Sequence, residues 1–150
     1  MMEKAIEEAK KGIMKGDSPF GACIVKNGRI ISLGHSTVLS KKDATCHAEM
    51  NAIRKACRKL GSNKLKGCMI YSTTEPCPMC FSAIHWAEID KIIYGTEIRD
   101  VHKLGFSELT IKDRTMKKKG GSKVKIQSGY MRKECLELLR FWKENGGRTY

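Results

Sequence analysis

The sequence predicts a layered α/β domain whose sheet is largely parallel and sits behind one antiparallel hairpin. Three observations lead to this fold class. Helical and strand-like patterns alternate along the chain, Asn27-Gly28 joins two short strand patterns as a tight turn, and the later strand patterns are separated by helical ones. With 150 residues, 41% of them hydrophobic, the chain can build the core of one domain over residues 1–150.

The first half of the chain predicts a helix, a hairpin and a second helix. Residues 3–15 have apolar positions at helical spacing, and Gly16-Asp17-Ser18-Pro19 ends that pattern. Strands are expected at residues 20–26 and 29–34. The second helix starts near His47 and stops at Gly61. The inward positions are Ala5, Ile6, Ala9 and Ile13 in the first helix, and Ala48, Ala52, Ile53, Ala56 and Leu60 in the second.

The second half continues the alternation. Strands are expected at residues 68–73, 91–94 and 124–127, which makes five in all. Pro76 and Pro78 suit a strand-to-helix turn and the first turn of a helix that runs to about Ala87. Residues 96–119 have a weak pattern, with short helices expected near 101–104 and 108–111. The inward positions are Met79, Ala83, Ile84 and Ala87 in the third helix, and Met131, Cys135, Leu138, Leu139 and Trp142 in the last.

Composition favours a cytoplasmic protein with no membrane partner. No apolar run approaches the roughly 20 residues of a membrane span. The N-terminus continues into an amphipathic helix and lacks the apolar centre of a signal peptide. Seven cysteines are scattered along the chain, and the five outside the motif described below are expected to be buried free thiols, as in a reducing compartment.

The formal net charge of +13 raises the question of a nucleic-acid partner. Much of this charge is local, because residues 112–125 hold seven Lys or Arg against the single Asp113. No aromatic residues that could stack on bases interleave with these cations. A solvated loop is therefore favoured for this stretch over a binding surface, and nucleic acid stays a less favoured partner.

Two short stretches, Cys46-His47-Ala48-Glu49 and Glu75-Pro76-Cys77-Pro78-Met79-Cys80, carry the chemistry. His47, Cys77 and Cys80 offer zinc the three protein ligands of a catalytic site, with the fourth position left for water. Glu49 is then the spare carboxylate that moves protons. A thiol redox centre is the competing interpretation of the Cys-x-x-Cys pair, and a structural zinc site would need a fourth Cys or His.

The spacing of these residues adds a geometric condition. Residues two apart on a regular helix point roughly 200° away from each other. His47 and Glu49 can therefore face one metal only if His47 lies at the very start of its helix. Both halves of the motif are predicted at the starts of helices, where ligands of open α/β sheets bind and where the helix dipole favours thiolates at Cys77 and Cys80.

Across nearly its whole length the chain resembles the cytidine deaminase-like superfamily, whose signature is H-x-E…P-C-x-x-C, and within it the small zinc-dependent guanine deaminases. The resemblance implies a three-layer α/β/α fold with a mixed, mostly parallel five-stranded sheet. It rests on Pro19-Phe20-Gly21-Ala22, His47-Ala48-Glu49, Glu75-Pro76-Cys77-Pro78-Met79-Cys80, Ala83-Ile84-His85-Trp86-Ala87, Gly105-Phe106 and the closing Tyr150.

The resemblance also implies roles for the substrate pocket. Phe20 and Trp86 would pack against a purine ring, and backbone groups near Ala48 and Cys77 would orient the base. Two positions depart from the family pattern, because Glu108 stands where Asp is usual, on the base edge, and Ser36 stands where an Asn usually holds the substrate.

The small guanine deaminases suggest a further expectation about assembly. They exchange C-terminal segments between two subunits, so the chain is expected to form a homodimer. Residues of about 129–150, which end in Tyr150, would then close the partner's site.

The sequence therefore predicts a zinc aminohydrolase of a nucleobase, with guanine converted to xanthine and ammonia as the best single reaction. A tRNA adenosine deaminase is the nearest alternative and is favoured by charge. A deaminase of cytosine or another small heterocycle is made credible by Ser36. A non-catalytic zinc or nucleic-acid-binding module is the fourth interpretation, and the presence of Glu49 argues against it.

Overall fold

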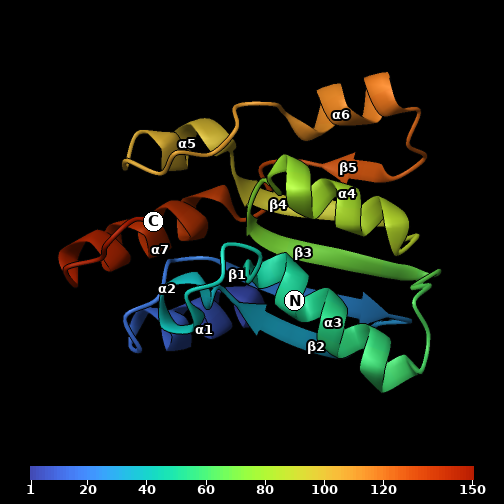
Figure 1. The fold of residues 1–150 in the computed structure, drawn as a ribbon, viewed down its shortest axis with the longest axis horizontal. Coiled ribbons are helices and arrows are strands. Elements are labelled where there is room, and N and C mark those ends of the chain that lie inside the picture. The colour runs from blue at the N-terminus through green and yellow to red at the C-terminus, as the bar shows by residue number, and fades with distance from the viewer.

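The computed structural model describes residues 1–150 as one five-stranded sheet with helices on both of its faces (Figure 1). The strand order is β2-β1-β3-β4-β5. The strands are β1 (Gly21–Lys26), β2 (Arg29–His35), β3 (Cys68–Thr74), β4 (Lys91–Thr96) and β5 (Lys125–Gln127). All five lie within a few residues of the positions that the sequence predicts.

The sheet is mixed, as the resemblance implies. Strand β1 pairs antiparallel with both β2 and β3, whereas β3 pairs parallel with β4 and β4 with β5. Four strands therefore run in one direction and β1 alone runs against them. The carboxyl ends of β2, β3, β4 and β5 consequently meet at one edge of the sheet, which is where open α/β sheets bind ligands.

The helices form two outer layers. Helices α1 (Met2–Ile13) and α7 (Arg132–Glu144) pack together on one face, while α3 (Ala48–Leu60) and α4 (Pro78–Trp86) pack together on the other (Figure 1). The apolar stripes of α1 and α7 are buried as predicted, including Ala5, Ala9 and Leu138. Three shorter helices, α2 (Val38–Lys41), α5 (Ile98–His102) and α6 (Asp113–Gly120), lie in the connections.

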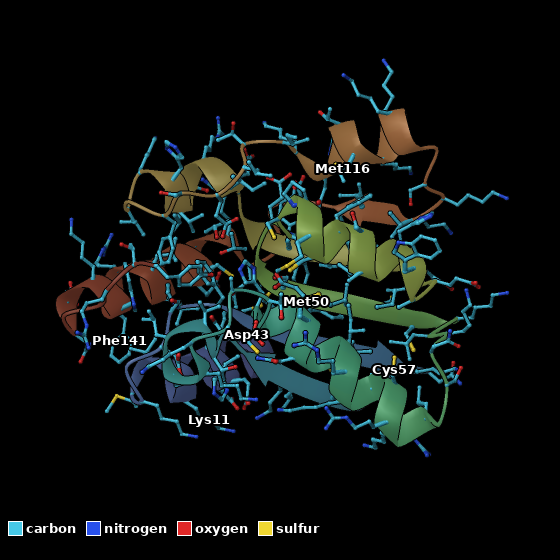
Figure 2. The ribbon with its side chains drawn as sticks, in the orientation of Figure 1. Lys11, Asp43, Met50, Cys57, Met116 and Phe141 are labelled. Carbon is cyan, nitrogen blue, oxygen red and sulfur yellow. The ribbon has the colours of Figure 1, made fainter.

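The segment after β4 differs most from the sequence prediction. Helix α5 begins three residues earlier than expected, because Glu97 and Asp100 form a capping box at its start. No helix forms at residues 108–111. A helix forms instead at α6, within the stretch predicted to be a solvated loop, where Asp113 is buried and Met116 faces α4 (Figure 2). Lys118 and Lys119 on α6 are exposed, which fits a solvated stretch and a binding surface equally.

Two details of side-chain burial also differ from the pattern. On α4 the buried residues are Cys80, Phe81 and Ile84, whereas Met79 and Ala83, expected to face inward, are half-buried. On α3 the predicted Leu60 is 38% exposed, and it is the last residue of the helix.

Close packing against Gly34 places α3 where the site needs it. A Cβ atom at Gly34 would lie 2.4 Å from the Ala48 carbonyl oxygen and 2.7 Å from the Ala52 nitrogen. Only glycine lets β2 and the first turns of α3 approach this closely. The contact brings the N-terminus of α3, with His47, to the carboxyl edge of the sheet.

All seven cysteines are free thiols, and the five outside the metal motif are buried or half-buried, as predicted. No helix in the structure has the length and apolar character needed to cross a membrane.

Candidate metal and catalytic site

His47 lies at the irregular start of α3, which is the condition that the sequence sets. It is the N-cap residue, with extended backbone dihedrals of φ −63° and ψ 160°. Its Nδ1 atom lies 3.6 Å from Sγ of Cys77 and 3.7 Å from Sγ of Cys80. The extended backbone at His47 lets its ring share a centre with Glu49 despite their spacing of two.

The two cysteines occupy the first turn of α4. Cys77 is the N-cap, Pro78 follows at the first helical position, and Cys80 is completely buried. Hydrogen bonds from Cys80 and from His47 lower the pKa of the Cys77 thiol to about 4. The proton that Cys80 shares with Cys77, together with burial, raises the pKa of Cys80 well above its usual range. One thiolate is therefore already favoured at neutral pH.

The donor atoms fit a zinc ion. Zn–S bonds of about 2.3 Å and Zn–N bonds of about 2.0 Å at tetrahedral angles separate a sulfur and a nitrogen ligand by about 3.5 Å. The observed separations are 3.6 Å and 3.7 Å, and the three donor atoms all lie within 4.8 Å of one another. His47, Cys77 and Cys80 thus form a zinc site with the ligand count of a catalytic centre.

Glu49 is held beside this centre without belonging to the three metal donors. Its carboxylate is 5% exposed. The Ser72 hydroxyl donates to Oε1 at 2.7 Å, and the Cys80 thiol lies 3.4 Å from Oε2. Burial raises the pKa of Glu49, which suits a group that must both accept and return a proton.

Ser72 and Asn51 support the site and were not identified from sequence. Ser72 belongs to β3 and orients the Glu49 carboxylate. The Asn51 side-chain nitrogen lies within hydrogen-bonding distance of His35 O, Thr37 Oγ1 and Cys46 O, at 2.9–3.2 Å. It therefore fixes the loop that enters α3. The sequence offered one indication of a role for Ser72, namely a polar residue within a strand pattern that is otherwise largely apolar.

Tyr150, the last residue, folds back onto the site of its own chain. Its hydroxyl lies 3.2 Å from Nε2 of His47, and the two rings have centroids 5.7 Å apart. Because Nδ1 of His47 faces the thiols, a zinc ion would bind there, and Nε2 would then carry the proton and donate it to the Tyr150 oxygen. Two more rings pack behind Tyr150. The Phe106 ring centroid lies 5.5 Å from that of Tyr150, and the Phe20 ring centroid lies 5.0 Å from that of Phe106.

Glu108 and Ser36 are also brought close to the site. Burial, and then the negative charge of Cys77, raise the pKa of Glu108 to about 7. Ser36 is completely buried, and its hydroxyl has no hydrogen-bond partner although it lies beside Tyr150. An unsatisfied buried hydroxyl costs about 1–3 kcal/mol, so a ligand group that bonds to it would bind favourably.

Of the remaining residues predicted to contact the substrate, Ala48 lies next to the metal ligand His47 and Trp86 lies away from the ligands. Ala48 is the first residue of α3, and the N-cap His47 gives that helix start no side-chain hydrogen bond. Trp86 ends α4, roughly 9 Å of helix rise beyond Cys80. It is 75% exposed and contacts His85, since Phe81 and Ile84 take the inward face. The structure therefore does not bring Trp86 to the metal ligands of its own chain.

A large open pocket lies elsewhere. It has a volume of about 730 Å³ and is lined by residues around the starts of β4 and β5, such as Lys66, Asp90 and Lys125. This is the amino edge of the parallel strands, opposite the metal ligands. At the metal ligands, the Tyr150 ring lies against His47.

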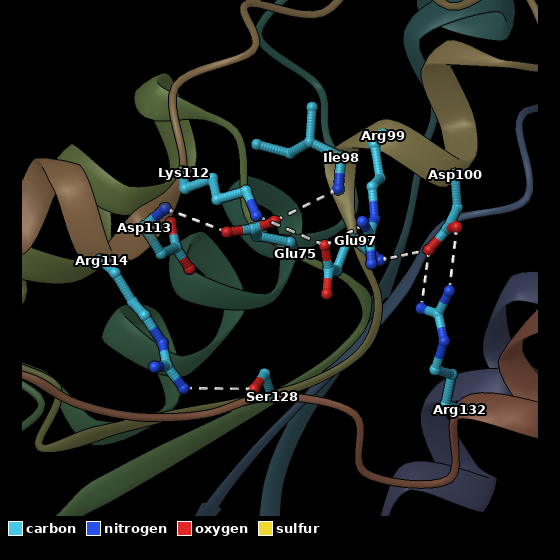
Figure 3. Close-up of polar contacts among 10 residues, drawn as sticks. All are labelled: Glu75, Glu97, Ile98, Arg99, Asp100, Lys112, Asp113, Arg114, Ser128 and Arg132. Carbon is cyan, nitrogen blue, oxygen red and sulfur yellow. Dashed lines mark hydrogen bonds and ion pairs between the residues drawn. The ribbon is translucent and has the colours of Figure 1, made fainter.

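Behind the metal turn lies a group of acidic side chains (Figure 3). Glu75 is 2% exposed, and Asp113 is completely buried with no partner for either carboxylate oxygen. Burial, and then the neighbouring Glu75, raise the pKa of Asp113 from its ordinary value of 3.8 to about 9. Asp113 is therefore a neutral carboxylic acid at pH 7.

This shift predicts how stability depends on pH. The unfolded chain loses the Asp113 proton above its ordinary value of 3.8, whereas the folded chain keeps it up to about pH 9. The wild type should therefore lose stability between these values, by about 2–3 kcal/mol from pH 6 to 8 at 1.36 kcal/mol per unit. Asp113→Ala should lack this loss. Urea unfolding of both proteins at several pH values tests this, and parallel stability profiles would contradict it.

The fold and the site together define a zinc-dependent deaminase. Residues 1–96 match the family model of the cytidine and deoxycytidylate deaminase zinc-binding region. The matched range contains His47, Glu49, Cys77 and Cys80, and it spans well over half of the chain. The chain belongs to this deaminase family.

Curated relatives divide between two substrates. The chain is 44% identical to the guanine deaminase of Bacillus subtilis over 108 residues, 71% of this chain and 69% of that protein. It is 48% identical to the tRNA-specific adenosine deaminase of Aquifex aeolicus over 94 residues, 63% of this chain and 62% of that protein. The tRNA-specific adenosine deaminase of Bacillus subtilis is 34% identical over 138 residues, 92% of this chain and 83% of that protein.

Solved structures show the same division. NE0047 in complex with 2,6-diaminopurine superposes with a TM-score of 0.89 at 26% identity, covering 99% of this chain and 82% of that one. The guanine deaminase of Bacillus subtilis superposes with a TM-score of 0.67 at 43% identity, covering 69% of this chain and 67% of that one. A tRNA deaminase that edits A to I at the wobble position superposes with a TM-score of 0.76 at 30% identity, covering 92% of this chain and 97% of that one. These matches confirm the fold and leave the base to be argued from the site.

Proposed function

We propose that the protein is a hydrolytic deaminase of a free purine base, with guanine converted to xanthine and ammonia as its reaction. The observation that carries this proposal is the position of Tyr150 against His47. The C-terminal tail places the Tyr150 ring against the metal ligand His47, where it would pack on a small base. A polynucleotide would require the whole tail to be displaced.

The metal ligands, Glu49 and Ser72 would have separate roles in the reaction. Zinc held by His47, Cys77 and Cys80 supplies a Lewis acid that activates water at neutral pH. Glu49 would take one proton from the attacking water and pass it to a ring nitrogen of the base, and then take the remaining hydroxyl proton and deliver it to the leaving amine, so that ammonia departs as the carbonyl forms. Ser72 keeps the Glu49 carboxylate in place through these transfers by donating to Oε1.

Two further side chains support a purine with hydrogen-bond donors on its edge. Glu108 would accept N–H groups of the guanine edge as a carboxylate. The unpartnered Ser36 hydroxyl would bond to the base directly or through a water. The aromatic rings of Phe106 and Phe20, which lie behind Tyr150, would support the purine contact.

The test is a panel of substrates. Purified, zinc-loaded protein should release ammonia from guanine faster than from adenine, cytosine, guanosine or tRNA. Guanine is expected to give the highest kcat/KM because it offers Glu108 two adjacent donors, whereas adenine offers only one amine. Equal or greater turnover of cytosine would favour the small-heterocycle deaminase instead.

A tRNA adenosine deaminase is the second candidate, and two observations favour it. The tRNA-specific adenosine deaminase of Bacillus subtilis matches 92% of the chain, against 71% for the guanine deaminase. The net charge is +13, and the exposed lysines of α6 carry part of it. Such an enzyme should lose activity steeply as salt rises, because phosphate contacts release counterions. A neutral base would show no such slope, and neutralising Lys118 and Lys119 would change nothing.

Removal of the tail separates these functions. Deleting Arg148-Thr149-Tyr150 should leave the fold and the zinc intact, because Tyr150 is partly exposed and a terminal tail contributes little to the core. Turnover of guanine should nevertheless fall by roughly 10–100-fold, since aromatic contact with a base is worth about 1–3 kcal/mol. Steady-state kinetics and zinc analysis measure both. Unchanged guanine turnover would show that the tail is not part of the site.

We also propose a homodimer in which C-terminal segments can be exchanged. Mixing and refolding two impaired variants tests exchange, one with Glu49→Gln and an intact tail, the other with Glu49 and no residues 148–150. Activity should rise above that of the tail-less variant alone only if the tail of one chain closes the site of the other. Light scattering reports the dimer independently, and a dimer without recovered activity would assign each tail to its own chain.

A further inference from the structure

Glu75 joins the start of two helices with one carboxylate. It is 2% exposed and lies two residues before the metal ligand Cys77. Its Oε2 accepts the backbone N–H of Ile98 at 3.2 Å, and its Oε1 accepts the backbone N–H of Asp113 at 3.1 Å (Figure 3). Ile98 and Asp113 are the first residues of α5 and α6. A carboxylate is favoured there, since each helix start leaves N–H groups unpaired and carries a partial positive charge.

The chain between these two contacts carries Glu108. Residues 98–113 leave the core at α5 and return to it at α6. Between them Phe106 is 1% exposed and packs against Phe20 and Tyr150. The neighbours of Glu108, Ser107 and Leu109, are exposed, and Leu109 is 65% exposed. The position of Glu108 therefore depends on the Phe106 contact and on the two ends that Glu75 holds.

Glu75 is itself fixed to the sheet. Its backbone N–H donates to the Thr96 carbonyl at 2.8 Å. The Thr74 and Thr96 hydroxyls lie 2.8 Å apart beside it, at the carboxyl ends of β3 and β4. The carboxylate thus stands on a rigid base that leads within two residues to Cys77.

We propose that Glu75 is a positioning residue of the deamination site, which clamps both ends of residues 98–113 to the metal-ligand turn and so fixes Glu108 relative to His47 and Cys77. The inference rests on the proposed function, because it assigns Glu108 to the base. A neutral amide cannot replace the carboxylate. Gln offers one oxygen acceptor, and its NH₂ group would face the second backbone N–H.

Hydrogen exchange tests the clamp without any substrate. In zinc-loaded Glu75→Gln, amides of residues 98–113 should exchange at least roughly tenfold faster than in the wild type, because charge-assisted hydrogen bonds are lost at both ends. Peptides from α1 and β1 should be unchanged. Asp17→Asn is the matched control, since Asp17 is 2% exposed and accepts the Ser40 backbone N–H at 3.0 Å outside the site. Unchanged exchange in residues 98–113 would overturn the proposal.

A backbone pair of variants tests the same contact without altering the metal turn. Asp113→Ala keeps the N–H that Glu75 accepts, whereas Asp113→Pro deletes it. Proline is well tolerated at the first position of a helix, and Lys112 before it already has the extended dihedrals that proline requires, φ −68° and ψ 147°. Exchange in residues 98–113 should rise in Asp113→Pro and stay low in Asp113→Ala. Equal exchange in both would show that the Asp113 N–H is not an anchor.

Kinetics on whichever base is turned over then distinguishes positioning from support of the fold. Glu75→Gln should raise KM roughly tenfold with a smaller effect on kcat, and in a Glu108→Gln background it should have little further effect. Equal losses in both backgrounds, or loss of the zinc, would make Glu75 a support of the metal turn and overturn the proposal. If guanine proves inert, the proposed function fails while the exchange result still decides the clamp.

Discussion

Glu49→Gln should retain about one zinc per chain and lose roughly 10²–10⁴-fold in kcat, the usual contribution of a general acid–base residue. Gln keeps the size of the side chain and can still accept the Ser72 hydroxyl, but it cannot take a proton from water at neutral pH. The metal should remain because Glu49 is not among the three donors. Metal analysis and ammonia release measure the two effects on one preparation.

A second buried carboxylate serves as the control. Glu8 is 8% exposed and pairs with His35 at 3.0 Å and Lys11 at 3.0 Å, outside the metal donors. Glu8→Gln should cost some stability and leave kcat within about twofold, because it removes a partly buried ion pair but no proton transfer. If Glu49→Gln lost its zinc together with its activity, Glu49 would be a metal ligand and its assignment as the proton carrier would be wrong.

The fold was largely predictable because most of its helices and strands are determined by sequence patterns within the element itself. Helical spacing, the Asn27-Gly28 turn and Gly61 each act through nearby residues. The segment after β4 was not predictable for the same reason. Its anchors are the buried Glu75 and Phe106, whose partners lie far away in sequence. Helix α6 forms among lysines because its start bonds to Glu75, a contact that no periodicity of residues 113–120 reveals.

The metal centre was predictable from spacing, and its surroundings were not. His47, Cys77 and Cys80 follow from a motif, and the expected irregular backbone at His47 is confirmed. Ser72 and Asn51 act through hydrogen bonds across the fold, so only coordinates show them. The side chain of Trp86 points away from the metal because Phe81 and Ile84 fill the inward face of α4. Most residues of this helix are apolar, so the sequence pattern does not reveal which of them face inward.

Cys80→Ala should abolish zinc binding and bring deamination to the background rate. Two donors would remain, His47 and Cys77, and metal affinity depends on the full set of ligands. The metal stabilises the folded chain in proportion to RT ln(1 + [Zn]/Kd), about 4 kcal/mol at a thousandfold excess over Kd. The variant should therefore melt well below the zinc-loaded wild type, and slightly below the wild type treated with a chelator, because it also carries the small cavity left by the buried thiol.

Cys68→Ala is the matched control for this change. Cys68 is as completely buried as Cys80 but lies at the start of β3, outside the donor set. Its loss should lower stability by a small-cavity cost on the order of 1 kcal/mol and leave zinc and kcat unchanged. Cys80→Ala has the same cavity term and adds the metal. The difference between the two variants therefore isolates the contribution of zinc, and a Cys80→Ala protein that still held one zinc per chain would exclude Cys80 as a ligand.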